Sequence, residues 1–327
     1  MLLSLQLLLR LRGQLAMTDR PHLAPWYRIA DLGDAIGVEH GQAVVRLDGA
    51  AAKKLLPRLL PLLDGTRTLD EIVACLGERI RPAVEHALDV LAERGLLVDG
   101  PPEPEGAHTV ARFLAASVGR TEAGLAGALG AARVAVAGSG PAAAETARAL
   151  RSAGVGDVVH GDWSELPACD LAVAAPAPEE VAELEGWNRA ALAVRVSWLQ
   201  LLPYDGRFAA IGPLFVPYET CCHVCYRLRR RANIPYPLEF EAVESVPTAA
   251  ATPPPVVAAI AGLGALVAAR WLAAADPALP GRLFALDVRQ VPELTVHQVY
   301  RVPRCPACAR LEVRPLPWFK ETGAAAG

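Results

Sequence analysis

The 327-residue chain lacks an excess of charge of either sign. Its 32 basic and 35 acidic residues give a formal net charge of −3, so the charge balance does not favour nucleic acid or anionic lipid as a partner. Lysine is scarce, because only 3 of the basic residues are lysines. Together with the abundance of Ala and Pro, this is typical of a high-GC bacterial genome, so we give the Ala and Pro content no structural weight.

The chain also lacks an apolar run long enough to cross a membrane. The leucine run in residues 1–16 is too short, has no basic region before it and is interrupted by Arg10 and Arg12. We interpret residues 1–19 as an arm or as the product of an upstream start codon. The 14-residue run Val256–Ala269 is expected to be a buried core helix. We therefore expect a cytoplasmic protein without a membrane partner.

Catalytic patterns are missing as well: no Ser/His/Asp set, carboxylate pair or His-rich metal motif stands out. A content of 53% hydrophobic and 20% charged residues nevertheless excludes a disordered chain, and the length suggests two domains. We place the boundary in the stiff, Pro-rich linker 101–110. The predicted units are then 20–100 and 111–310, followed by a tail at 311–327.

Residues 20–100 show the pattern of a small winged-helix domain. Thr68 and Glu71 form a predicted capping box, and Pro57 and Pro61 predict a helix in two parts. The expected elements are strands at Trp26–Ile29 and Val44–Leu47, a two-part helix over Ala50–Leu63, helices at Thr68–Leu76 and Arg81–Arg94, and a wing strand at Leu96–Val98.

DNA binding by this domain is disfavoured, because the third helix carries Glu85, Asp89 and Glu93, which would repel phosphate. The alternative is β-augmentation, in which a peptide adds a strand beside Val44–Leu47 and lies against the third helix. Arg46, Lys53, Arg79 and Arg81 could then meet an acidic peptide, although each is equally readable as a solvated surface charge. The residues expected to line the groove are Val44, Val45, Arg46, Leu47, Lys53, Arg79, Arg81, His86 and Val90.

Residues 111–310 alternate strands and helices, which indicates a parallel α/β sheet. A helical stretch over 111–129 leads into the domain, and residues 239–255 are expected to form a long loop. The predicted strands are Arg133–Ala137, Val158–His160, Leu171–Ala174 and Leu192–Val196.

A glycine-rich turn, Gly138-Ser139-Gly140, follows the first of these strands and opens a helix, which is the context of a dinucleotide fingerprint. Asp162 falls where a ribose-binding acid would be expected. Pro141, however, removes a backbone N–H that could face a phosphate. We interpret Gly138, Gly140 and Asp162 as a vestigial nucleotide site, with a working site as the alternative.

The most specific motif is the pair Cys222-x-x-Cys225 and Cys305-x-x-Cys308. Four thiolates suit tetrahedral zinc, and four-cysteine sites are normally structural because no position stays open for water. Two redox pairs are the alternative. Cys221 is a spare thiol beside the first pair, and Cys75 and Cys169 are expected to be inert core residues.

A resemblance to a known family rests on the stretch Ile211–Pro217 followed by Cys222-x-x-Cys225-x-x-Leu228-Arg229-Arg230. This stretch resembles the ThiF-like (ubiquitin-activating-enzyme-like) partner proteins of YcaO cyclodehydratases, which bind leader peptides in thiazole/oxazole peptide biosynthesis. Pro25–Arg28 and Leu62–Arg67 resemble the family's N-terminal, PqqD-like peptide-recognition element. The resemblance runs from about residue 20 to 310.

The resemblance implies that residues 20–98 capture a precursor's leader, that the four cysteines hold zinc, and that the α/β domain docks a separate YcaO enzyme. Adenylating relatives keep a third glycine and an Asn-x-x-Arg-Gln segment. Here Ala143 replaces that glycine, and Asn188-Arg189 lacks the rest of the segment. We therefore expect a non-catalytic component that does not use ATP itself, in a chain without room for a fused YcaO domain.

Two alternatives remain open. One is a ThiF-type adenylating enzyme that activates a peptide carboxyl terminus, and the other is a winged-helix regulator with a degenerate sensor domain. The sequence does not identify the precursor, the azole type or the product class. It also does not decide between a monomer and a homodimer.

Overall fold

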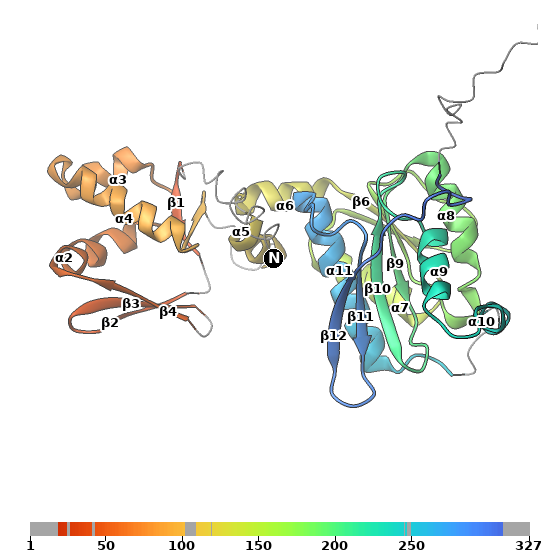
Figure 1. Ribbon diagram of the computed structural model, residues 1–327. Helices are drawn as coiled ribbons and strands as arrows, with labels where there is room; N and C mark the ends of the chain where they lie inside the picture. Colours follow the sequence, from red (N-terminus) through yellow and green to blue (C-terminus); the bar gives the residue numbers. More distant parts are fainter. Residues whose placement is uncertain are drawn as a thin grey trace, which may run out of the picture.

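The computed structural model describes residues 19–24, 27–40, 43–101, 109–118, 120–244, 246 and 250–309. A small N-terminal region (residues 19–101) precedes a larger α/β region (residues 109–309), as Figure 1 shows. The predicted arm, most of the predicted linker, the C-terminal tail, and Pro25 and Trp26 of the family-like opening lie outside the described residues.

The N-terminal region contains a three-stranded antiparallel sheet in the order β2-β3-β4. Its strands are β2 (Arg28–Asp31), β3 (Ala35–His40) and β4 (Ala43–Asp48). The sequence did not reveal β3, whose alternation of apolar residues is interrupted by Gly37. An added Cβ at Gly37 would come within 2.9 Å of the end of the exposed Leu32 side chain.

The helices of this region follow the predicted pattern. They are α2 (Ala50–Leu59), the 3-10 turn η2 (Leu60–Leu62), α3 (Leu69–Leu76), η3 (Glu78–Ile80) and α4 (Arg81–Glu93). The two-part helix and the Thr68–Glu71 capping box are confirmed. Val84 and Leu91 of α4 are fully buried, as their spacing predicts.

The expected wing strand forms as β5 (Leu97–Asp99), but it does not join the β2–β4 sheet. Its partner is β1 (Pro21–Leu23), and the two strands are antiparallel. Val98 also packs into the core of the α/β region. This strand pair therefore connects the two regions.

The α/β region contains a seven-stranded sheet in the order β12-β11-β10-β9-β8-β6-β7. Strands β7, β6, β8 and β9 are parallel, whereas β10, β11 and β12 join antiparallel. Of the parallel strands, β6, β7 and β8 were predicted, whereas β9 and the antiparallel strands β10, β11 and β12 were not. The strands are β6 (Arg133–Ala137), β7 (Asp157–Gly161), β8 (Leu171–Ala174), β9 (Trp198–Leu202), β10 (Phe208–Phe215), β11 (Arg282–Asp287) and β12 (Glu293–Gln298).

Two local predictions for this region are wrong. Residues 192–194, expected in a strand, end the helix α8 (Glu183–Val194), because Leu184, Trp187 and Ala191 recur at helical spacing and are buried. The expected loop after residue 239 begins inside the helix α10 (Pro237–Glu244).

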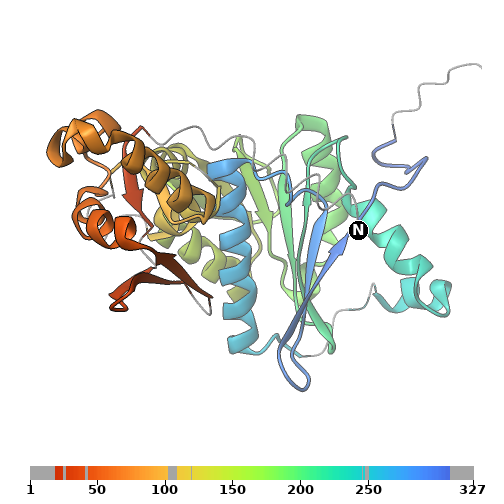
Figure 2. The same cartoon turned by 60° about the vertical axis from the view of Figure 1, so that its left-hand side comes forward.

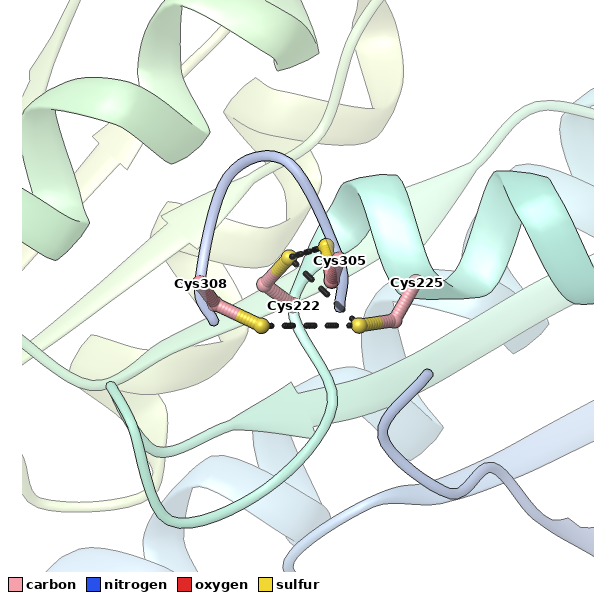
Figure 3. Close-up of side chains that lie close together, drawn as sticks. All are labelled: Cys222, Cys225, Cys305 and Cys308. Atoms are coloured by element: carbon pink, nitrogen blue, oxygen red, sulfur yellow. Dashed lines mark hydrogen bonds between the residues drawn. The ribbon is translucent and has the colours of Figure 1, made fainter. Parts of the chain in front are cut away.

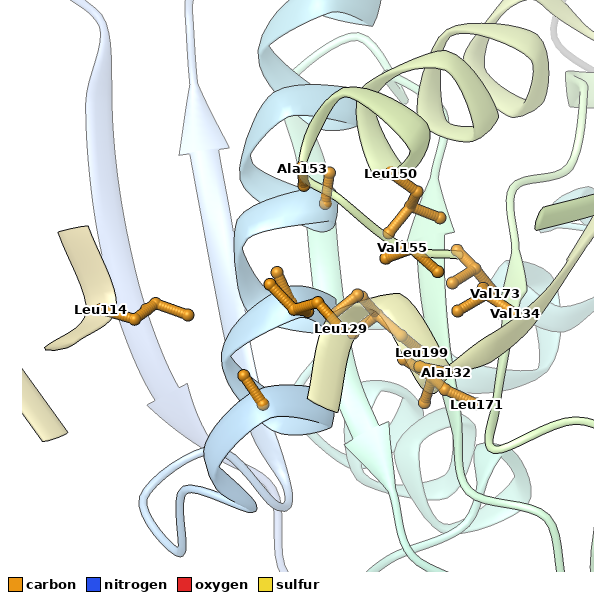
Figure 4. Close-up of a cluster of buried hydrophobic side chains, with 14 of the residues drawn as sticks. Leu114, Leu129, Ala132, Val134, Leu150, Ala153, Val155, Leu171, Val173 and Leu199 are labelled. Atoms are coloured by element: carbon orange, nitrogen blue, oxygen red, sulfur yellow. The ribbon is translucent and has the colours of Figure 1, made fainter. Parts of the chain in front are cut away.

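Helices cover both faces of the sheet. On one face, α5 (Thr109–Val118), α6 (Glu122–Ala131), α7 (Pro141–Ser152) and α11 (Pro254–Ala274) enclose the larger core, part of which Figure 4 shows. On the other face, α8 and α9 (His223–Ala232) enclose a second core that contains four buried cysteines. The predicted helical stretch over 111–129 is thus two helices.

Helix α11 is long and apolar enough to cross a membrane by length and composition. It contacts α7, α6 and β10, however, and half of its most apolar window is buried inside the protein. Figure 2 shows it lying along one face of the sheet. This packing is that of a core helix, as expected for Val256–Ala269.

Candidate metal centre and glycine loop

The structure brings together the four cysteines of the two CxxC motifs. Cys222 directly precedes α9 and Cys225 lies in its first turn, while Cys305 and Cys308 come from the loop after β12. Their sulfur atoms lie within 4.8 Å of one another (Figure 3). The separations are 3.8 Å for Cys222–Cys225, 3.7 Å for Cys222–Cys305 and 3.5 Å for Cys225–Cys308.

These separations fit a tetrahedral metal site. Zinc–sulfur bonds of about 2.3 Å in tetrahedral geometry place neighbouring sulfur atoms about 3.8 Å apart, whereas a disulfide requires about 2.0 Å. None of the four cysteines is more than 3% exposed, so the position between them is closed to water. The arrangement is that of a structural rather than a catalytic metal site.

Cys225 is the sulfur that the surroundings favour most as a thiolate. Hydrogen bonding from the Cys222 thiol, and further from the Val302 amide at 3.3 Å, lowers the pKa of Cys225 to about 4. Burial instead raises the pKa of Cys221 to about 12. Cys221 is also absent from the four-sulfur cluster, which supports the choice of Cys222 as the cluster residue.

A buried polar network connects the cysteine cluster to the sheet. The His223 backbone N–H donates to Asn188 Oδ1 at 3.0 Å, and His223 Nδ1 lies 2.9 Å from Gln200 Oε1. Asn188 and Gln200 are fully buried, and burial lowers the pKa of His223 to about 3, so its ring is neutral. No local pattern pointed to this network, because its members come from three separate elements, α8, β9 and α9.

The remaining cysteines only partly match the expectation of core residues. Cys75 is exposed on α3, so its prediction as a core residue is wrong. The helical spacing points Ile72 and Val73 inward, and both are fully buried, which leaves Cys75 on the outer face. Cys169 is half-buried.

The glycine loop (residues 138–140) joins β6 to α7, as predicted. Gly138 has a φ of 134°, and a side chain there would meet the Ala175 carbonyl oxygen at 2.2 Å, so both the backbone and the neighbouring loop require glycine. Asp162 follows β7, but its carboxylate accepts hydrogen bonds from the amide and hydroxyl of Ser164 in its own loop.

A carboxylate that the sequence did not single out lies against this loop. Both oxygens of Glu180 accept the Ser139 N–H at 3.1 Å, and one accepts the Ala177 N–H at 2.9 Å. Burial acts to raise the pKa of Glu180, but these hydrogen bonds lower it overall, so the group is anionic at neutral pH. In the sequence, the only feature that could have pointed to Glu180 is its position as an acidic residue shortly after a buried strand.

The residues predicted to line a peptide groove lie on four elements. Val44, Val45, Arg46 and Leu47 belong to β4, which is an edge strand with β3 as its partner. Lys53 lies on α2, Arg79 on η3, and Arg81, His86 and Val90 on α4.

Two of the arginines expected to meet an acidic peptide already have carboxylate partners. Arg46 pairs with Asp34 and Asp48, and Arg81 pairs with Asp70 and Glu78. Val44 is 64% exposed on the edge strand. The strand edge, rather than a free positive patch, is therefore the main feature of this surface.

Comparison with known proteins gives structural relatives only: no protein-family model and no curated protein matches the chain. The heterocyclase TruD has 26% identity and a TM-score of 0.66 over 88% of this chain. A heterocyclase in complex with substrate and cofactor has 26% identity and a TM-score of 0.65, again over 88%. This chain spans 42% and 39% of those two chains, respectively.

Escherichia coli MccB, in complex with AMPCPP and MccA, shares the fold with 14% identity, a TM-score of 0.64 and coverage of 88% of this chain and 99% of that one. The α/β architecture of this chain is thus shared with the heterocyclase TruD and with MccB. This agrees with the ThiF-like resemblance at the level of fold.

Proposed function

We propose that this protein is a non-catalytic partner in the biosynthesis of azole-containing, ribosomally made peptides. It binds the leader of a precursor peptide and delivers the core to a separate YcaO cyclodehydratase, which forms azolines from Cys, Ser or Thr. Zinc in the cysteine cluster holds the α/β region together and takes no part in the chemistry. We place the protein in the cytoplasm.

The observation that carries this proposal is the likeness to two heterocyclases at 26% identity over 88% of the chain. One of them is described with substrate and cofactor. This chain spans about two fifths of their length, and the proposal assigns it binding and delivery.

The N-terminal region supports leader binding by strand addition. Among the residues that the structure describes, β4 pairs only with β3, so the other side of the strand has no partner strand there for its backbone N–H and C=O groups. A leader in extended conformation would satisfy these groups as a fourth strand. Because Arg46 and Arg81 are already paired with carboxylates, backbone bonds and apolar contacts would supply most of the affinity.

Titration of a labelled leader peptide against the full chain tests this. Successive residues of a strand point their amides to opposite sides, so one of the variants Val44→Pro and Val45→Pro removes an edge amide and the other an amide bonded to β3. We expect the edge-facing variant to fold normally and to lose at least tenfold in affinity.

On β2, the opposite edge of the same sheet, the edge-facing one of the variants Ile29→Pro and Ala30→Pro is the matched control and should leave binding unchanged, whereas the other removes an amide bonded to β3. Saturable binding of operator-like DNA in place of the leader would contradict the proposal. So would a loss of leader binding caused by the β2 variants alone.

Adenylation is the second candidate, because MccB, which shares the fold, is described with ATP. It predicts ATP–pyrophosphate exchange by the isolated protein. Two contacts disfavour adenylation. The Glu180 carboxylate already accepts the Ser139 N–H of the glycine loop, and Asp162 accepts a hydrogen bond from Ser164 in its own loop. Exchange activity that is abolished by Gly140→Trp would establish it.

A further inference from the structure

Glu180 lies at the part of the sheet where a parallel α/β fold binds its ligands. Strand β6 has β7 on one side and β8 on the other. The connection β6–β7 passes through α7 on one face of the sheet, and β8–β9 passes through α8 on the other. Ligands of such sheets bind in the crevice beyond the carboxyl ends of the two strands at which the connections diverge.

The Glu180 carboxylate connects the loop that follows β6 with the loop that follows β8. The glycine loop follows β6, and the turn η4 (Pro178–Glu180) follows β8. Glu180 reaches across to the Ser139 amide, 41 positions away, while also accepting from Ala177 on its own side. A negatively charged oxygen pair thus already lies on the loop amide that an incoming phosphate would use.

The two loops also lie close together at Gly140 and Ala177. A side chain at Gly140 would lie 3.2 Å from the Ala177 side chain, so the two loops are in close contact. A phosphate on the Ser139 amide would either touch the Glu180 carboxylate, with like charges a few ångströms apart, or displace it and leave it without its two amide donors.

We propose that Glu180 is an internal anion that closes the glycine loop and excludes phosphate-bearing ligands from this domain. The inference deepens the proposed function, and rests on it in one respect: it gives the residue by which this chain leaves ATP to its partner. Glu180 is thus a specificity-determining residue, since one side chain decides whether the loop accepts a nucleotide.

The test uses the full chain with Glu180→Ala and Glu180→Gln, and inorganic pyrophosphate and Mg²⁺–ATP as probes in isothermal titration calorimetry. We expect Glu180→Ala to bind pyrophosphate at least tenfold more tightly than the unchanged protein. Glu180→Gln keeps an acceptor oxygen without the charge and should fall between the two. Glu179→Ala is the matched control, because it removes the same charge from an exposed position on the same turn.

Two outcomes would overturn the inference: tight ATP binding by the unchanged protein, or no gain of binding in a Glu180→Ala protein whose circular dichroism and leader binding are intact. The Glu180→Gln protein repeats the test if Glu180→Ala does not fold. Failure of the proposed function would instead appear as absent leader binding in all variants, whatever their response to pyrophosphate.

Discussion

The cysteine cluster and the glycine loop lie on the same sheet and differ in what completes them. Each joins two segments distant in the sequence: residues 222–225 with 305–308, and residues 138–140 with Glu180. In the cluster, four buried sulfur atoms converge at separations that suit a metal ion. At the glycine loop, by contrast, the carboxylate of Glu180 already accepts the hydrogen bond that the Ser139 N–H can donate.

The two places also lie at opposite ends of the parallel strands. The glycine loop follows the carboxyl end of β6. The cysteine segment follows β10, whose last residue Phe215 pairs with Trp198 at the amino end of β9. The carboxyl end is where such a fold normally binds substrates. In our proposal, the end that is usually functional is closed by Glu180, and the opposite end carries the four-cysteine cluster.

Replacing a cluster cysteine should have the largest effect. In Cys225→Ser, three thiolates remain, and because the binding energy of a structural zinc is coupled to folding, we expect loss of the metal and a destabilisation of more than about 3 kcal/mol. Metal content per chain and thermal unfolding with and without a chelator measure this.

Cys221→Ser is the matched control, since Cys221 is equally buried and adjacent but lies outside the cluster. It should retain the metal and lose about 1 kcal/mol. Equal metal loss in both variants would show that the cluster residues are wrongly assigned. Unchanged stability after complete removal of the metal would show that the site is not structural.

A smaller effect is expected at the other end of the sheet. Gly138→Ala forces an L side chain into a φ of 134° and within 2.2 Å of the Ala175 carbonyl oxygen. We expect a destabilisation of about 2–4 kcal/mol without loss of metal, measured by denaturant unfolding. Gly161→Ala, where an added Cβ would have no neighbour within 4 Å, should cost less than about 1 kcal/mol. An equal loss of stability in the two variants would show that the glycine loop is not closely packed against the loop that follows β8.

The difference between the two places also explains what the sequence could predict. A CxxC motif encodes its own geometry, because the x-x spacing brings two sulfur atoms together whatever the fold. Because a zinc site of this kind needs four thiolates and each motif supplies two, the two motifs are expected to meet. Glu180 has no such local pattern, since its partner Ser139 is decided by which strand lies beside β6.

The fold divides in the same way. Helices with strong caps, such as α3 with Thr68 and Glu71, and the buried strands β6 and β8 were predictable from local pattern. The run at 192–196 was assigned wrongly, because a short, mostly apolar stretch suits a strand as well as the last turn of a helix. Strand β12 is mostly exposed, so its sequence carries no period that burial would impose.

The polar network of Asn188, Gln200 and His223 should contribute less to the stability of the protein than either the cysteine cluster or the glycine loop. Asn188→Ala removes the acceptor of the His223 N–H inside the protein, so we expect a loss of about 1–3 kcal/mol and faster transfer of the metal to a chelator. Arg189→Ala, on the exposed side of the same helix, is the control. If metal transfer is equally fast in both variants, the network does not support the cluster.

The smallest effect is expected for Asp162→Ala, which would be a severe change if Asp162 held a ribose. Hydrogen bonds from Ser164 lower the pKa of Asp162, so its stabilising contribution is present above the unfolded-state pKa and is lost as the pH falls through the folded-state value. We expect the melting temperature at pH 7 to fall by less than about 2 °C, and the difference from the unchanged protein to vanish once the pH lies below the lowered folded-state pKa of Asp162. Introduced together with Glu180→Ala, the substitution should leave the gained pyrophosphate binding intact, because the pyrophosphate probe has no ribose. A selective loss of ATP binding in this double variant would instead show that opening the glycine loop restores a complete nucleotide site, with Asp162 free to turn towards the ligand.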